Sequence, residues 1–140
     1  MTTAIDTNVV IALWDTDAAL SLAAQTALET AFRRGNLVAA APVFAELLVA
    51  PGRTETFVNR FLEETGIAVE WILDEPIWRS AGRAFQAYAE RRRKQRSPQP
   101  RRILADFLIG AHAEIRGYRL LTLDQGLYRA AFPKLSLEMV

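Results

Sequence analysis

Four acidic residues of this chain lie in segments that are otherwise apolar or carry no other acid. The chain has 16 acidic residues, and most of them have polar or charged neighbours. The four exceptions are Asp6, Glu46, Asp106 and Asp124. Asp6 is the single charge in TTAIDTNVVIALW, and Glu46 is the single charge in APVFAELLVAPG. Asp106 is the single acid in ILADFLIGAHA, and Asp124 follows RLLT in LLTLDQG.

A buried carboxylate without a partner is energetically costly. Such a group therefore either protonates or binds a cation. Nothing near Asp6 in sequence offers a charge of opposite sign, so we expect its partner to be a metal ion and not a side chain. Each acid taken alone could also be a turn-closing, capping or solvent-facing residue. The joint pattern favours a metal site.

The predicted elements place the four acids at one edge of a sheet. Asp6 and Asp124 follow predicted strands, and we expect Glu46 and Asp106 in the first turns of helices that follow a strand or a loop. Because ligands of parallel sheets lie beyond the carboxyl ends of the strands, all four side chains are expected to converge there. Converging carboxylates repel one another, and a divalent cation removes this repulsion. An all-oxygen donor set favours Mg²⁺ or Mn²⁺ over zinc.

The order of apolar runs and helical patterns predicts an α/β fold with a mainly parallel sheet. The predicted strands span residues 3–5, 37–40, 67–72, 119–122 and 135–139. The predicted helices span residues 9–14, 17–32, 42–49, 54–65, 76–93, 104–116 and 124–130. Residues 95–102, QRSPQPRR, are expected to form a loop.

Composition limits the class of protein. With 140 residues, 51% of them hydrophobic and 24% charged, residues 1–140 are expected to form a single domain. A net charge of +1 predicts that any attraction to phosphate is local. The absence of cysteine excludes a disulfide scaffold and a thiolate zinc site. No signal peptide or membrane-length apolar run is present, so we expect a cytoplasmic protein without a membrane partner.

The single histidine narrows the chemistry further. Acid–base chemistry that needs two histidines is excluded within one chain, so hydrolysis by this chain would have to be assisted by the predicted metal. His112 itself follows Leu108 by four residues on an apolar helix, and we interpret it as a packing residue. Trp14, Trp71 and Trp78 are likewise interpreted as core or interface residues and not as base-stacking platforms.

The motifs IDTN, PVFAEL, ADFLIGAHA and GYRLLTLDQGLYR, in this order, resemble the PIN domain. They resemble in particular the VapC-type toxin nucleases of bacterial type II toxin–antitoxin systems, from Ile5 to about Pro133. The resemblance implies a three-layer α/β/α fold with a mainly parallel central sheet of about five strands. It also implies a Mg²⁺- or Mn²⁺-dependent endoribonuclease that leaves 5′-phosphate and 3′-hydroxyl ends.

The resemblance carries over to individual positions. The catalytic and metal-binding residues it implies are Asp6, Glu46, Asp106 and Asp124. Asn8 and Thr122 match polar positions of the family, where they would orient metal-bound water or a carboxylate. A helix N-cap for Asn8 and a strand-end hydroxyl for Thr122 are the alternatives. Gln125 and Gly126 stand where some family members have a further acid, which argues against a firmly held second metal.

A basic run, ERRRKQRSPQPRR, precedes the Asp106 helix. Its seven basic residues are Arg91, Arg92, Arg93, Lys94, Arg96, Arg101 and Arg102. They could bind RNA phosphates beside the metal. The alternative is a solvated helix end, where cations are favoured in any case.

The resemblance also implies partners. These are a homodimeric second copy and a cognate antitoxin, whose C-terminal segment typically blocks the acidic cleft, often with an arginine. The predicted helices at 9–14 and 43–49 are apolar on more than one face, which suits burial by a partner or by the core.

Three other functions stay open at this point. The chain could be a PIN-domain RNA-processing nuclease without a toxin role, although its small size favours the toxin. It could be a non-catalytic module whose acids hold a metal, RNA or an antitoxin arginine. A phosphatase with Asp6 as nucleophile is disfavoured, because Asn8 stands where a general acid would be needed.

Overall fold

A five-stranded sheet forms the centre of the molecule in a computed structural model, which describes residues 1–96 and 101–140. The strands are β1 (Thr2–Ile5), β2 (Asn36–Ala40), β3 (Ile67–Glu70), β4 (Arg119–Thr122) and β5 (Leu137–Met139). Their order is β3-β2-β1-β4-β5, and every neighbouring pair is parallel. The predicted α/β class and the predicted parallel sheet are therefore confirmed.

The strand order puts β1 at the centre of the sheet, with β2 and β4 on its two sides. Ala4 is in register with Val38 of β2 and with Leu120 of β4. From β1 the chain first builds outward to β2 and β3, and then crosses to β4 and β5 on the other side. The connections therefore diverge at the carboxyl ends of β1 and β4, which is where open parallel sheets bind ligands.

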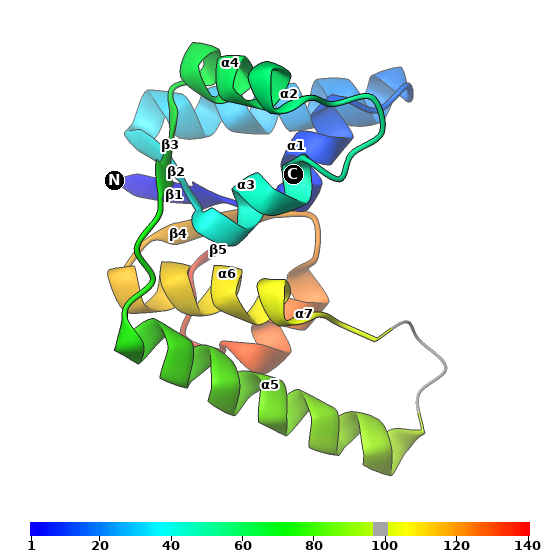
Figure 1. The fold of residues 1–140 in the computed structure, drawn as a ribbon, viewed down its shortest axis with the longest axis vertical. Coiled ribbons are helices and arrows are strands. Elements are labelled where there is room, and N and C mark those ends of the chain that lie inside the picture. Colours follow the sequence, from blue (N-terminus) through cyan, green and yellow to red (C-terminus); the bar gives the residue numbers. More distant parts are fainter. Residues whose placement is uncertain (97–100) are drawn as a thin grey trace.

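Helices cover both faces of this sheet. They are α1 (Thr7–Leu13), α2 (Ala18–Arg34), α3 (Ala41–Leu47), α4 (Glu55–Thr65), α5 (Glu75–Gln95), α6 (Leu104–Arg116) and α7 (Gln125–Ala131). Figure 1 shows α2 behind the sheet, α3 and α6 in front of it, and α5 on the outer side of α6. This arrangement is the expected α/β/α layering.

The core is densest around α6, where every residue from 107 to 113 is buried. A helix that is apolar on all sides must be covered on all sides, and α6 lies between the sheet and α5. Gly110 allows a close approach here, because a Cβ atom at this position would lie 2.4 Å from the ring of Phe132 and 3.1 Å from that of Tyr128. The helix ends at Gly117, which has a φ of 71°.

Several predicted boundaries differ from the structure. The strand predicted over 67–72 ends at Glu70, and the helix predicted over 42–49 spans only Ala41–Leu47. The long helix continues two residues past Arg93 to Gln95. Of the predicted loop at 95–102, residues 97–100 lie outside the described part of the chain. Among the described residues, no helix is long and apolar enough to cross a membrane.

Candidate active site

Asp6 stands at the carboxyl end of β1 and begins α1. Its carboxylate accepts a hydrogen bond from the N–H of Thr7 at 2.8 Å and another from the hydroxyl of Thr122 at 2.8 Å. The side chain is buried, and burial raises its pKa to about 6, while the hydrogen bond from Thr122 lowers it. The expectation that Asp6 has no side-chain partner is therefore wrong, because the fold brings the hydroxyl of Thr122 from β4 next to it.

Thr122 links the ends of β1 and β4. Its buried hydroxyl donates to Asp6 and accepts from the N–H of Asp124 at 2.9 Å. The amide nitrogen of Asn8 lies 3.4 Å from the same hydroxyl, and the amide oxygen of Asn8 accepts from the N–H of Leu123 at 3.2 Å. Asn8 is not the N-cap of α1, because Asp6 occupies that position. The structure therefore brings both predicted polar residues together with Asp6 and Asp124.

Glu46 reaches the same region from α3. It lies in the last turn of this helix and not in the first, so its predicted position was wrong. The predicted start at residue 42 is within one residue of the observed start, but α3 has only seven residues and packs against α1. The hydroxyl of Thr7 donates to the Glu46 carboxylate at 2.7 Å. Burial raises the pKa of Glu46, and the charge of Asp106 raises it further.

Asp106 and Asp124 complete the set. Asp106 lies in the first turn of α6, as expected, and accepts from the N–H of Ile103 at 3.3 Å. Burial raises the pKa of Asp106, and the charge of Asp124 adds to this, while Ile103 and Arg102 lower it. Asp124 is the N-cap of α7, where one oxygen accepts from the N–H of Leu127, and its other oxygen pairs with Arg102.

The charge of Asp106 interacts with the charges of the other acids. The charge of Asp106 raises the pKa of both Asp6 and Glu46, and the charge of Asp124 raises the pKa of Asp106. Tyr128 lies among them with a buried hydroxyl, and burial together with the nearby carboxylates raises its pKa. This hydroxyl makes no hydrogen bond of regular geometry to any described residue.

Sequence reasoning missed two contributors to this site, Thr7 and Tyr128, and gave a third, Arg102, a different role. Thr7 directly follows Asp6, and Tyr128 follows Asp124 by one helical turn, so both spacings were available as signals. Arg102 carried a signal only as part of the basic run, since its pairing with Asp124 depends on tertiary structure.

The ligand atoms that the four acids offer are of the type that a hard divalent cation prefers. All four acids offer oxygen ligands, and the pKa of three of them is raised by burial and by a neighbouring carboxylate, which is an effect that a bound cation offsets. Within residues 1–96 and 101–140, however, no three histidine or acidic side chains stand close enough to form a ready-made metal cluster. Threonine hydroxyls, backbone N–H groups and Arg102 contact the carboxylate oxygens instead.

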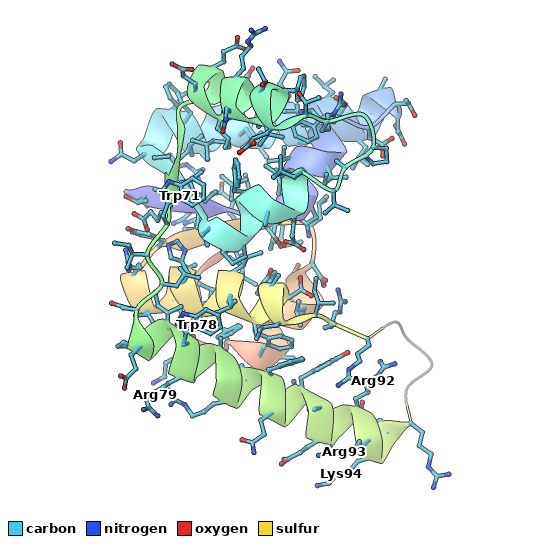
Figure 2. The ribbon with its side chains drawn as sticks, in the orientation of Figure 1. Trp71, Trp78, Arg79, Arg92, Arg93 and Lys94 are labelled. Carbon is cyan, nitrogen blue, oxygen red and sulfur yellow. The ribbon has the colours of Figure 1, made fainter. Side chains whose placement is uncertain are left out.

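The basic run divides into two parts in the structure. Figure 2 shows Arg92, Arg93 and Lys94 gathered at the last turns of α5. A concavity of about 420 Å³ is lined by Ala89 and by four arginines. These are Arg92, Arg93, Arg96 and Arg101. Arg91 and Lys94 do not line this concavity, and Arg102 turns to the acidic site.

His112 and the tryptophans have contacts other than the four acids of the sheet edge. His112 is fully buried in α6, and its Nε2 lies 2.8 Å from a carboxylate oxygen of Glu70, so the interpretation as a packing residue is confirmed. Trp14 packs edge-on against Phe57 and Phe61 of α4. Trp71 and Trp78 are exposed, so neither is a core residue.

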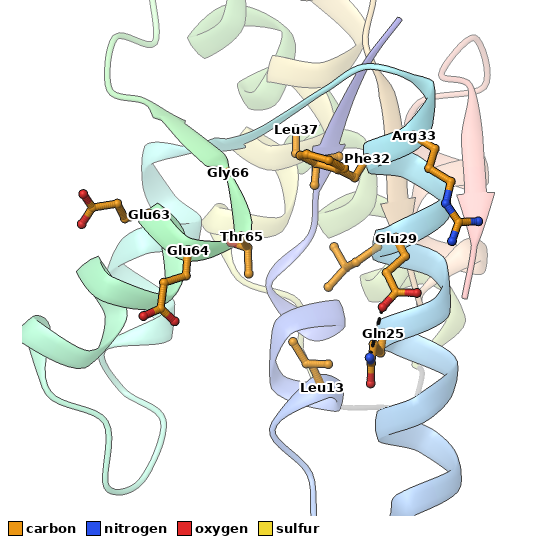
Figure 3. Close-up of a pocket in the computed structure, with 11 residues that line it drawn as sticks. Leu13, Gln25, Glu29, Phe32, Arg33, Leu37, Glu63, Glu64, Thr65 and Gly66 are labelled. Atoms are coloured by element: carbon orange, nitrogen blue, oxygen red, sulfur yellow. Dashed lines mark hydrogen bonds between the residues drawn. The ribbon is translucent and has the colours of Figure 1, made fainter.

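A second concavity, of about 470 Å³, lies between α2 and the end of α4 (Figure 3). Its apolar lining comes from Leu13, Leu28 and Leu37 together with Phe32. Charged residues also line it, and these are the acidic Glu29, Glu63 and Glu64 and the basic Arg33. The groove contains none of the four acids of the sheet edge.

The chain belongs to the PIN-domain family, because the sequence matches this family over residues 3–133. A comparison with curated proteins finds no match. Among solved structures, the chain is similar to VapBC-1 from nontypeable Haemophilus influenzae, with a TM-score of 0.68 and 19% identity over 99% of this chain and 98% of that one. It is also similar to a toxin–antitoxin complex from Klebsiella pneumoniae, with a TM-score of 0.61 and 16% identity over 95% and 94% of the two chains.

FitAcB from Neisseria gonorrhoeae is a further similar structure, with a TM-score of 0.57 and 20% identity over 96% of this chain and 95% of that one. At these identities the likeness establishes the shared fold. Together with the family match, it shows that the predicted PIN-like architecture is correct.

Proposed function

We propose that this chain is a Mg²⁺- or Mn²⁺-dependent endoribonuclease and the toxin of a toxin–antitoxin pair. The observation that carries the proposal is the set of hydrogen bonds that links the acids at the carboxyl edge of the sheet. Thr122 contacts both Asp6 and Asp124, and Thr7 contacts both Asp6 and Glu46. Membership of the PIN family supports phosphodiester hydrolysis. The likeness to solved toxin–antitoxin complexes supports the toxin role.

The metal would be held by the four acids, and when bound it would activate water and neutralise charge on the phosphate. The protein side chains supply positioning. The hydroxyl of Thr122 fixes one oxygen of Asp6 and also holds the N–H of Asp124, so one side chain aligns both strand ends. Thr7 fixes Glu46, and Asn8 holds the turn that carries Asp124. These contacts limit the reorientation that the carboxylates need when they bind a cation.

The four arginines of the concavity at the end of α5 are proposed to bind RNA phosphates near the acidic site. No ion pair joins any of them to an acid within the described residues, so their charge is available to a ligand. Arg91 and Lys94 would add a weaker, less specific attraction, because they lie outside the concavity. The small net charge of +1 means that binding must come from this local concentration.

A cognate antitoxin and a second copy of the chain are the proposed protein partners. The groove between α2 and α4 supports the first, because its apolar lining with three acidic residues and one basic residue, Arg33, suits an amphipathic segment that carries mainly basic residues. Exposed Trp71, Ile72 and Trp78 support a further protein contact on another part of the surface.

The proposal is tested by cleavage in vitro. The purified protein is incubated with total RNA and Mn²⁺ or Mg²⁺, with or without EDTA, and new 5′-phosphate ends are mapped. Wild type should cleave only with metal, and Asp6→Asn should lower the rate by at least about 100-fold. Asp74→Ala is the matched control, since Asp74 is exposed and its side chain makes no capping hydrogen bond.

Two outcomes would favour the other functions. Metal binding without cleavage of any RNA by the folded wild type would support the non-catalytic module. Cleavage in vitro without growth inhibition on expression would support an RNA-processing nuclease.

A further inference from the structure

Arg102 provides a positive charge inside the acidic site. Its guanidinium pairs with one oxygen of Asp124, and within the described chain Asp124 is the only one of the four acids that pairs with a cation. The side chains of Arg102 and Asp124 are 42% and 25% exposed, so the pair is accessible to ions from solution. The other oxygen of Asp124 accepts from the N–H of Leu127 at 3.3 Å, so both oxygens are engaged.

The backbone around Arg102 is fixed in place. The N–H of Arg102 donates to the hydroxyl of Tyr88 at 2.7 Å, and the N–H of the next residue, Ile103, donates to Asp106. Tyr88 is itself held by its ring, which packs against Phe107 with a centroid separation of 5.4 Å. The backbone that carries the Arg102 side chain is therefore tied to α5 through Tyr88 and to α6 through Asp106.

Two consecutive arginines take different directions at this point. Arg102 faces Asp124, whereas Arg101 lines the concavity at the end of α5. The two residues have the same charge and are neighbours in sequence, yet only Arg102 contacts an acid of the site. Substitutions of Arg101 and Arg102 can therefore be compared to separate the effect of the contact with Asp124 from the effect of total charge.

We propose that Arg102 is an internal counter-ion of the acidic site, which a divalent cation must displace from Asp124 before Asp124 can bind the cation. The inference rests on the proposed function, because it takes the four acids as the metal site. In the metal-free protein, Arg102 offsets the repulsion among the carboxylates. In exchange, it weakens metal binding, since a guanidinium close to a divalent cation is repelled. The residue would thus set the metal concentration at which the site assembles.

The test measures Mn²⁺ binding without RNA, by the EPR signal of free Mn²⁺ at low ionic strength. Arg102→Gln should bind Mn²⁺ about tenfold more tightly than wild type. Arg102→Lys keeps the charge and should bind as wild type does. Arg101→Gln changes the same total charge without touching the site and should stay within about twofold of wild type. Raising the salt to about 0.5 M should narrow the gap between Arg102→Gln and wild type.

Equal affinities for Arg102→Gln, Arg101→Gln and wild type would overturn the role of Arg102. If Arg102→Gln is not folded by circular dichroism, Arg102→Met replaces it, because this variant also removes the guanidinium charge that pairs with Asp124 and keeps a long unbranched side chain. Arg102→Met should then bind Mn²⁺ more tightly than wild type, and unchanged affinity would overturn the proposal.

The proposed function fails in a different way. If no variant binds Mn²⁺ at millimolar concentration, the metal site itself is wrong and the role of Arg102 falls with it. If wild type binds Mn²⁺ and Asp6→Asn does not, the metal site stands whatever the result for Arg102.

Discussion

The burial of Asp6 has opposite consequences for folding and for cation binding. Its side chain is 4% exposed, and its pKa is raised from 3.8 to about 6. Between pH 3.8 and about pH 6, Asp6 is therefore protonated in the folded protein and ionised in the unfolded chain. Stability falls as the pH rises through this window, and above it the loss amounts to about 3 kcal/mol. The same buried charge attracts a metal ion.

Asp6→Asn is therefore expected to stabilise the metal-free protein. We predict a gain of about 1–2 kcal/mol in the free energy of unfolding at pH 8, which is less than the full electrostatic cost because the amide has one oxygen for two donors. The gain should disappear near pH 4, where Asp6 of the folded wild type is protonated. Urea unfolding in EDTA at both pH values measures this. A variant less stable than wild type at pH 8 would contradict the pKa assigned to Asp6.

Thr122 is expected to matter through its hydroxyl and not through its shape. Thr122→Val removes the donor to Asp6 and the acceptor for Asp124, so we predict a loss of about 1–3 kcal/mol in stability. The pKa of Asp6 should rise further, which shifts the pH midpoint of cleavage upward.

Thr3 is the matched control for this variant. It is buried in the same sheet, but its hydroxyl has no hydrogen-bond partner among the described residues. Thr3→Val should be neutral or stabilising and should leave the pH profile unchanged. Equal effects of the two substitutions in urea unfolding and in the cleavage profile would show that the hydroxyl of Thr122 has no special role.

At the scale of the elements, α6 positions Asp106 because it is held rigidly between the sheet and α5. The close contact of this helix with Phe132 depends on the missing side chain of Gly110. We predict that Gly110→Ala lowers the free energy of unfolding by about 1–3 kcal/mol through overpacking. Gly82→Ala in α5 meets no atom within 4 Å and should stabilise by about 0.5–1 kcal/mol. Thermal or urea unfolding compares the two, and the same sign for both would contradict the packing described for α6.

The elements were largely predictable because their signals are local. Short apolar runs indicated all five strands, and the predicted helix starts at residues 17 and 54 and the predicted helix end at residue 116 agree with the structure to within one residue. The position of Glu46 was not predictable in the same way. Pro42 indicates where α3 begins, whereas the end of the helix and its approach to α1 depend on packing between distant segments.

The candidate site shows the same division between local and tertiary information. The isolation of Asp6, Asp106 and Asp124 in apolar sequence was sufficient to group them at one edge of the sheet. The contact between Thr122 and Asp6 was indicated only by the family resemblance and not by local sequence, because the two residues are 116 positions apart. Arg102 was expected either to bind RNA phosphates or to lie at a solvated helix end, and its pairing with Asp124 depends on tertiary structure.

At the scale of the whole molecule, acidic and basic residues gather in different places while the net charge stays at +1. The acids occupy the edge of the sheet and the arginines occupy the end of α5. We predict that Arg92→Gln/Arg96→Gln weakens binding of single-stranded RNA in the Asp6→Asn background, where RNA is not cleaved. The slope of log K against log salt should fall by about 0.7 for each lost phosphate contact.

Arg83→Gln/Lys94→Gln is the matched control for this measurement. It removes two charges from the same helix at positions that do not line the arginine concavity. A salt titration by fluorescence anisotropy compares the pairs. Equal reductions in slope would show that α5 attracts RNA only through its total charge.

The most direct test of the central proposal is induced expression of wild type and of Asp6→Ala in a bacterial host, with RNA from each sequenced for new 5′-phosphate ends. The proposed toxin nuclease predicts growth arrest and discrete new ends for wild type and neither for the variant. A soluble, folded wild type that causes no arrest and produces no new ends would contradict it.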